Sequence, residues 1–283
     1  GLASAVGTLS AELDKLVIST FFSTSDYAIY TNAAKELPLT VLSSATTMVI
    51  MPKIVRHLHR GEEKQAISLW KDTFVLNYAV MAVMVFGIVT YAPEVITILY
   101  SEKYLPGVTV FRIYTLILLL RTTYFGMILN ATGNTKYIFR VSVAQLCVNV
   151  VLNLIGCRWL GFIGPAIASA LVEYTANYMM LRITAQKLSI SVASLFPSKP
   201  LMMITIVNLV LSAFFLWLKR IMPLEVYFAQ LLANITSNQF LGPDIITSGQ
   251  CIESIVLGVL WVIMYGIILY RPMQKQWRKI NEK

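Results

Sequence analysis

Charged residues are scarce in this chain. Only 13% of its 283 residues are Asp, Glu, Lys or Arg, whereas 57% are hydrophobic. An ordinary soluble domain has roughly a quarter of its residues charged, and the mean hydropathy of this chain is +0.69. A soluble fold of this length has too little interior to bury so much apolar surface. The composition therefore excludes an ordinary soluble protein.

Residues suited to metal or redox chemistry are also few. The chain has two histidines, His57 and His59, and three cysteines, and neither set has a metal-binding or redox spacing. We find no G-x-S-x-G motif, no phosphate-binding P-loop and no loop with paired carboxylates. We therefore expect no catalytic residue, no metal and no cofactor, and a protein that is not an enzyme.

Apolar runs long enough to cross a bilayer recur along the whole chain. A membrane-spanning helix needs roughly 20 such residues, and the spans must be helical because lipid offers an open backbone no hydrogen-bond partner. We predict an all-α, polytopic transmembrane helix bundle. Its spans, about eight in number, are predicted at 1–22, 37–51, 73–92, 108–129, 141–156, 162–180, 201–219 and 251–270. Pro38 and Pro52 are predicted to bracket the second span, which, like the fifth, should extend into its flanks.

The basic residues indicate an orientation for these spans. The net charge of +9 comes from Lys and Arg placed between apolar runs, which argues against nucleic acid as a partner. Most of the 23 basic residues fall on one side, in connections such as 52–72 and 271–283. Because the Lys- and Arg-rich side of a multi-pass protein faces the cytoplasm, we predict that both ends of the chain are cytoplasmic.

Ionisable side chains inside the first span are informative, because each is costly in lipid unless it meets a partner or a cavity. Glu12 and Lys15 are placed to pair at i, i+3, whereas Asp14 points elsewhere and needs a partner on another helix. An ion pair that only fixes helix packing is the alternative to a functional role. In the second span, Ser43 and Thr47 belong to a hydroxyl stripe that we interpret as hydrogen-bonded to its own helix.

The fourth span contains two arginines with different expected environments. Arg112 and Arg121 are nine residues apart, which places them on opposite faces of a regular helix. Arg112 lies near the outer end and can extend to the interface. Arg121 lies near the middle of the bilayer, so we predict that it faces a cavity.

The fifth and sixth spans carry polar stripes that can face each other. Gln145, Asn149 and Asn153 follow at intervals of four residues, and Glu173 and Asn177 do the same on the next span. Hydrogen bonding between helices is an alternative explanation for the amides. A carboxylate at the depth of Glu173 must be paired, protonated or hydrated.

Several segments, taken in order, resemble a known family of transporters. They look like parts of the polysaccharide and O-antigen flippases, bacterial inner-membrane proteins of the superfamily that also holds multidrug and toxin extruders. The matching segments are Asp14-Lys15, 25–34, Val49-Ile50-Met51-Pro52-Lys53, Leu129-Asn130-Ala131-Thr132-Gly133-Asn134-Thr135-Lys136, 149–153 and 161–168. Pro165 departs from the pattern, because the family more often has a small residue there.

The resemblance implies an architecture and an activity. Residues 1–185 would form the second six-helix bundle of a flippase, and residues 186–283 two additional helices with an outer loop and a basic cytoplasmic tail. The protein would move an undecaprenyl-diphosphate-linked oligosaccharide across the bacterial inner membrane by alternating access. Its expected partners are this lipid-linked substrate, the bilayer, a missing N-terminal half, and polysaccharide polymerase and chain-length proteins.

Roles follow for the polar residues within the spans. Ion coupling is assigned to Glu12, Asp14 and Glu173. Contact with the substrate is assigned to Lys15, Arg121, Gln145, Asn149, Asn153 and Asn177. Two alternatives stay open: a cation-coupled multidrug or metabolite extruder of the same superfamily, and a membrane polysaccharide polymerase or ligase. The second would typically have a large outer loop rich in arginine or acid, whereas the longest outer connection here is only 220–250.

The predicted orientation can be tested by labelling. In a variant without the native cysteines, a cysteine placed between Ser23 and Lys35 should react with a membrane-impermeant maleimide added outside the cell. A reporter fused after Lys283 should be active in the cytoplasm, since the basic connections stay on that side. Labelling of the 23–35 connection only from the cytoplasm would show that the orientation is inverted.

Overall fold

The chain forms a bundle of helices. The computed structural model describes residues 2–35, 37–222, 224, 226–228, 230 and 244–281, and every regular element in these ranges is helical, which confirms the predicted fold class. Most of the predicted outer loop and the last residues of the basic tail lie outside the described residues. The elements are α1 (Leu2–Phe21), α2 (Thr24–Ala33), α3 (Thr40–His59), α4 (Glu63–Thr90), α5 (Ala92–Leu99), η1 (Glu102–Gly107), α6 (Val108–Ile117), η2 (Leu118–Thr122), α7 (Met127–Ala131), α8 (Thr135–Leu160), η3 (Gly161–Ile163), α9 (Gly164–Lys187), α10 (Val192–Leu195), α11 (Ser198–Ile221) and α13 (Asp244–Asn281).

Each predicted span overlaps a helix, although not every helix is equally apolar. Within the described residues, five helical stretches are long and apolar enough to cross a membrane: Glu63–Thr90, Glu102–Thr122, Thr135–Lys187 (which holds both α8 and α9), Ser198–Ile221 and Gly249–Gln274. The 20-residue helices α1 and α3 fall outside this set. The charges of Glu12, Asp14 and Lys15 exclude α1, and hydroxyl and basic side chains lower the hydropathy of α3.

Pro52 does not end the second span, contrary to the prediction. It lies inside α3, which continues to His59. A proline removes one backbone hydrogen bond, but membrane helices tolerate this where neighbouring groups satisfy the freed carbonyl. The chain turns only at Gly61, whose φ of +73° suits a residue without a Cβ. Beside this turn, His57 Nδ1 lies 2.6 Å from Glu62 Oε2.

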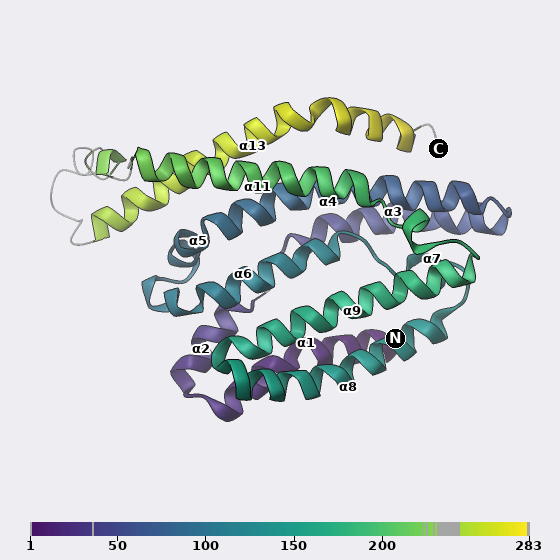
Figure 1. The fold of residues 1–283 in the computed structure, drawn as a ribbon, viewed down its shortest axis with the longest axis horizontal. Coiled ribbons are helices and arrows are strands. Elements are labelled where there is room, and N and C mark those ends of the chain that lie inside the picture. The colour runs from purple at the N-terminus through teal and green to yellow at the C-terminus, as the bar shows by residue number, and fades with distance from the viewer. Residues whose placement is uncertain are drawn as a thin grey trace.

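The long helices form two groups on opposite sides of the molecule. Figure 1 shows α4, α11 and α13 along one side and α1, α8 and α9 along the other, with α6 between them. In the first group α11 and α13 both pack on α4, and in the second α8 packs on both α1 and α9. The largest buried apolar cluster joins α3, α4, α11 and α13, and a second one joins α1, α2 and α6.

The two C-terminal helices are attached to α4 by polar as well as apolar contacts. The Tyr265 hydroxyl of α13 donates to the carbonyl of Ala79, 2.6 Å away, and the Tyr78 hydroxyl lies 2.7 Å from Thr205 Oγ1 of α11. Phe215 and Trp261 stack with their ring centroids 5.6 Å apart. The division of the chain near residue 185 stays a prediction, and it falls close to the end of α9.

The turn from α8 to α9 brings two helix backbones into direct contact. Gly161, with φ of +60°, ends α8. Gly156 and Gly164 then face each other: a Cβ on Gly156 would lie 2.8 Å from the Gly164 carbonyl oxygen, and a Cβ on Gly164 would overlap the carbonyl of Gly156. Only glycine at both positions allows this close packing.

We expect Gly164→Ala to destabilise the protein by about 1–3 kcal/mol, the usual cost of forcing extra atoms into a packed interface. Thermal unfolding of the purified protein in detergent measures the loss. Gly258→Ala in α13 is the matched control, because a Cβ there meets nothing within 4 Å. Equal melting temperatures for the two variants would show that the α8–α9 contact is not tight.

Candidate functional site

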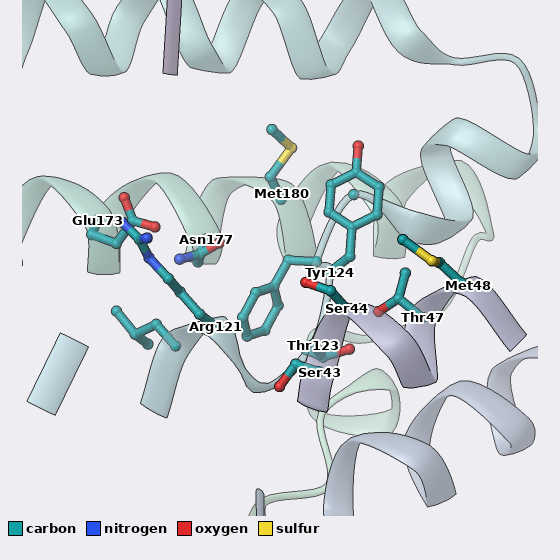
Figure 2. Close-up of a pocket in the computed structure, with 13 residues that line it drawn as sticks. Ser43, Ser44, Thr47, Met48, Arg121, Thr123, Tyr124, Glu173, Asn177 and Met180 are labelled. Atoms are coloured by element: carbon teal, nitrogen blue, oxygen red, sulfur yellow. The ribbon is translucent and has the colours of Figure 1, made fainter. Parts of the chain in front are cut away.

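A cavity of about 460 Å³ opens between α3, η2 and α9. We call it the main pocket. Its walls come from α3, from η2 with the segment that follows it, and from α9 (Figure 2). The lining residues are Ser43, Ser44, Thr47, Met48, Leu120, Arg121, Thr123, Tyr124, Phe125, Gly126, Glu173, Asn177 and Met180.

A break in the predicted fourth span forms one wall of the main pocket. The span was expected to be one regular helix over 108–129, but α6 ends at Ile117, η2 follows, and Thr123 is extended with φ of −146° and ψ of 158°. Asn77 Nδ2 of α4 donates to the Thr122 carbonyl at 3.0 Å, which satisfies a group that the break releases. Irregular backbone at membrane depth is tolerated where it is buried in protein or lines a cavity.

The break also removes the regular helix on which the predicted opposite placement of Arg112 and Arg121 was based. Because residues 112 and 121 do not share a regular helix, their spacing alone does not place them on opposite faces. Arg112 is exposed on α6, and its Nε donates to the Val89 carbonyl at 3.2 Å. Arg121 lies in η2 and lines the main pocket, so the predicted contrast between the two residues matches the structure for a different reason.

Arg121 meets two of the other predicted site residues in the main pocket. Figure 2 shows its side chain extending towards the part of α9 that carries Glu173 and Asn177. Gln145 Nε2 of α8 donates to Glu173 Oε2 at 2.8 Å, so this carboxylate is held from the neighbouring helix. The pocket thus combines a guanidinium, a carboxylate and an amide.

The hydroxyl groups of α3 form the opposite part of the lining. Ser43, Ser44 and Thr47 belong to the stripe that we interpreted as bonded to its own helix. This is wrong for Ser43, whose buried hydroxyl has no hydrogen-bond partner. On the same helix, Thr46, which is not part of this stripe, donates from its Oγ1 to the Leu42 carbonyl at 2.9 Å. Tyr124 also lines the pocket, and no sequence pattern pointed to it.

A smaller cavity of about 80 Å³, the side pocket, lies next to the main pocket and shares Arg121 with it. Glu12 and Lys15 of α1 line it together with Tyr114 of α6. The predicted pair within α1 is confirmed, since Lys15 Nζ lies 2.8 Å from Glu12 Oε2. Lys15 and Arg121, predicted from separate spans, therefore line one cavity.

Asp14 has the partners that its position required. It is fully buried, and its Oδ2 accepts hydrogen bonds from the hydroxyl of Tyr30, 3.0 Å away, and from that of Tyr114. These three residues, from α1, α2 and α6, form what we call the Asp14 cluster. Sequence reasoning missed both tyrosines, and their place in or beside apolar segments was the only available signal.

The amides of α8 lie outside both pockets. Asn149 and Asn153 are buried, with exposed fractions of 2% and 0%. Asn149 Nδ2 donates to the Ser10 carbonyl of α1 at 2.7 Å, and Asn153 Nδ2 donates to Asn149 Oδ1 at 2.9 Å. This placement favours the interhelical alternative over the predicted substrate contact.

Three buried oxygen atoms on helices α1, α8 and α9 have no hydrogen-bond partner. They are Asp14 Oδ1, Asn153 Oδ1 and Ser169 Oγ. An unsatisfied buried acceptor costs about 1–3 kcal/mol. Carboxylate, amide and hydroxyl oxygens are suitable ligands for a hard cation. No group of three or more His, Cys, Asp or Glu residues in the described part of the chain could hold a metal ion.

Comparisons with known proteins give the family. The family model described as "Lipid II flippase MurJ" matches residues 2–237. The probable lipid II flippase MurJ of Chlamydia trachomatis is 27% identical over 139 residues, which cover 46% of this chain and 26% of that protein. The probable low-salt glycan biosynthesis flippase Agl15 of Haloferax volcanii is 23% identical over 173 residues, 60% of this chain and 37% of that protein.

The fold has a solved counterpart. A structure described as "Lipid II flippase MurJ, inward closed conformation" matches with a TM-score of 0.67 and 17% identity, covering 96% of this chain and 52% of that one. The chain thus spans about a quarter to a third of the curated relatives and half of the solved structure. None of these relatives is named for O-antigen, so that part of the expected resemblance receives no support. Over most of its length, this multi-pass helical membrane chain matches one family, and it belongs to the lipid II flippase MurJ family.

Proposed function

We propose that the protein is a transporter that flips a diphosphate-linked glycan on a lipid carrier across the bacterial inner membrane. The observation that carries this proposal is the main pocket, in which Arg121 lies with Glu173 and Asn177 at the broken fourth span. Membership of a lipid II flippase family supports a lipid-linked substrate.

Arg121 provides the group that a diphosphate requires. A guanidinium offers a planar fork of N–H donors that can hold phosphate oxygens through two bonds. Lys15 adds a second cation through the side pocket. Both side chains are partly buried, so their attraction for an anion is stronger than that of a fully exposed group.

The remaining lining of the main pocket suits a sugar. The hydroxyls of Ser43, Ser44 and Thr47 and the amide of Asn177 can exchange hydrogen bonds with sugar hydroxyls. Tyr124 offers an aromatic face of the kind that packs against apolar ring edges. In this proposal the pocket is one wall of a transport cavity, and a second bundle supplies the other wall.

Arg121→Ala in the full-length protein should reduce flipping by about tenfold to a hundredfold, the range expected when a charge-assisted hydrogen bond is lost. Complementation of a strain depleted of its own flippase, with lipid-linked precursor counted in each leaflet, measures this. Arg121→Lys should recover part of the activity, because lysine keeps the charge but loses the fork.

Arg112→Ala is the matched control for this experiment, because Arg112 is an exposed arginine of α6 outside both pockets. It should flip substrate normally. Normal flipping by Arg121→Ala would refute the proposed role. If the Arg121→Ala protein were lost from the membrane, Arg121 would instead be identified as a packing residue.

A cation that drives transport is the second part of the proposal, and Asp14 is the best placed acid for it. Of the three acids assigned to coupling, Glu12 has a side chain that is 60% exposed and paired with Lys15, and Glu173 lines the main pocket. Asp14 is fully buried, and one of its oxygens lacks a hydrogen bond. This arrangement also fits the alternative, a cation-coupled extruder of the same superfamily.

We expect Asp14→Asn to remove the dependence of transport on a cation gradient. Proteoliposomes with imposed Na⁺ or H⁺ gradients measure this, because an amide keeps the size and hydrogen bonds of the carboxylate but not its charge. Glu12→Gln, the control, should keep the dependence of the native protein. Retained coupling in Asp14→Asn would exclude Asp14 as the coupling acid.

A further inference from the structure

A third cavity, of about 360 Å³, lies where the beginning of α4 meets α10 and the beginning of α11. It shares no lining residue with the main or the side pocket. Lys71, Asp72 and Lys199 line it together with the apolar side chains of Val75 and Phe196. We call it the interfacial cavity. Figure 1 shows α4 and α11 lying side by side, and the contacts between them agree.

The interfacial cavity lies at the level where two helices leave the apolar part of the membrane. On α4, the residues after Asp72 are almost all apolar up to Gly87, and on α11 the apolar run begins at Leu201. The charged side chains of the cavity therefore come just before these runs, whereas Val75 lies within one. A cavity that is charged on one side and apolar on the other matches the boundary between lipid headgroups and acyl chains.

The charges of the interfacial cavity have both signs. Lys71 Nζ donates to the Ser194 carbonyl at 2.8 Å, and an ammonium has three N–H donors, so two are left for other acceptors. Lys199 is exposed and contributes a second ammonium. Asp72 has an exposed fraction of 9%, and Ser68 Oγ lies 3.5 Å from its Oδ2. A carboxylate offers about four lone-pair sites, so Asp72 can accept hydrogen bonds from more than one donor at a time.

We propose that the interfacial cavity binds the headgroup of a phospholipid that carries both a phosphate and a primary ammonium, as phosphatidylethanolamine does. The phosphate lies between Lys71 and Lys199, and the ammonium donates to Asp72. The acyl chains leave along Val75 and Phe196. This binding is separate from the transported substrate and does not depend on the proposed transport activity.

The mixture of charges distinguishes this headgroup from others. Phosphatidylglycerol carries the same phosphate, which satisfies the two lysines, but it has no ammonium group to donate to Asp72. Phosphatidylcholine has both charges, but its quaternary nitrogen has no N–H to donate to the carboxylate. Soluble phosphoethanolamine has the right groups but leaves the apolar wall of the cavity uncovered.

Native mass spectrometry of the full-length protein in detergent tests the proposal with four probes: phosphatidylethanolamine, phosphatidylcholine, phosphatidylglycerol and soluble phosphoethanolamine. We expect the first to bind most tightly. Lys199→Ala should weaken its binding by about tenfold, as expected for a lost charge-assisted bond. Asp72→Asn should abolish the preference for phosphatidylethanolamine over phosphatidylcholine.

The control is Lys187→Ala, which removes another exposed lysine, at the end of α9 and outside the cavity. It should leave lipid binding unchanged. Three results would overturn the proposal: equal binding of the ethanolamine and choline lipids to the native protein, an equal loss in Lys187→Ala and Lys199→Ala, or tighter binding of soluble phosphoethanolamine than of the lipid. Lys199 is exposed, so its variant remains informative even if Asp72→Asn does not fold.

Discussion

A polar group inside a bilayer has to find its partner within the protein, and the second group of helices is arranged around this requirement. Asp14 is satisfied by a hydroxyl from α2 and another from α6, through Tyr30 and Tyr114. Asn149 of α8 bonds to Ser10 of α1. Because lipid cannot replace any of these partners, separating the helices exposes unsatisfied groups. The polar contacts therefore fix which helices are neighbours, and small residues such as Gly164 set how closely they approach.

The same requirement explains where the chain can depart from a regular helix. The fourth span breaks after α6, and the freed carbonyl of Thr122 is satisfied by Asn77 from α4. Without such a partner, the break would be too costly at membrane depth. Its consequence for function is positional, because the short η2 segment holds Arg121 where the main and side pockets meet.

Two consecutive residues of α1 connect the two parts of the proposed function. Lys15 lines the side pocket next to Arg121, whereas the neighbouring Asp14 is bonded to Tyr30 and Tyr114. Tyr114 lines the side pocket as well. A rotation or shift of α1 must therefore alter both environments at once. In the proposed transporter, this provides a direct physical connection between cation occupancy at Asp14 and the shape of the substrate pocket.

The amino-acid sequence by itself determined the fold class, the approximate helix positions and the pairing of Glu12 with Lys15, because apolar run length and i, i+3 spacing are local properties. It also showed that Asp14 needs a distant partner. Only the tertiary structure decided which residues serve, as Tyr30 and Tyr114 are neighbours of Asp14 in space but not in sequence. The extension of α3 past Pro52 is likewise seen only in the structure. The break before Thr123 depends on a neighbouring helix, because Asn77 of α4 satisfies the Thr122 carbonyl. The amides of α8 show what spacing alone does not determine. Their spacing predicted one polar face, but such a face can line a cavity or contact another helix. In the structure, Asn149 contacts α1 through its hydrogen bond to Ser10.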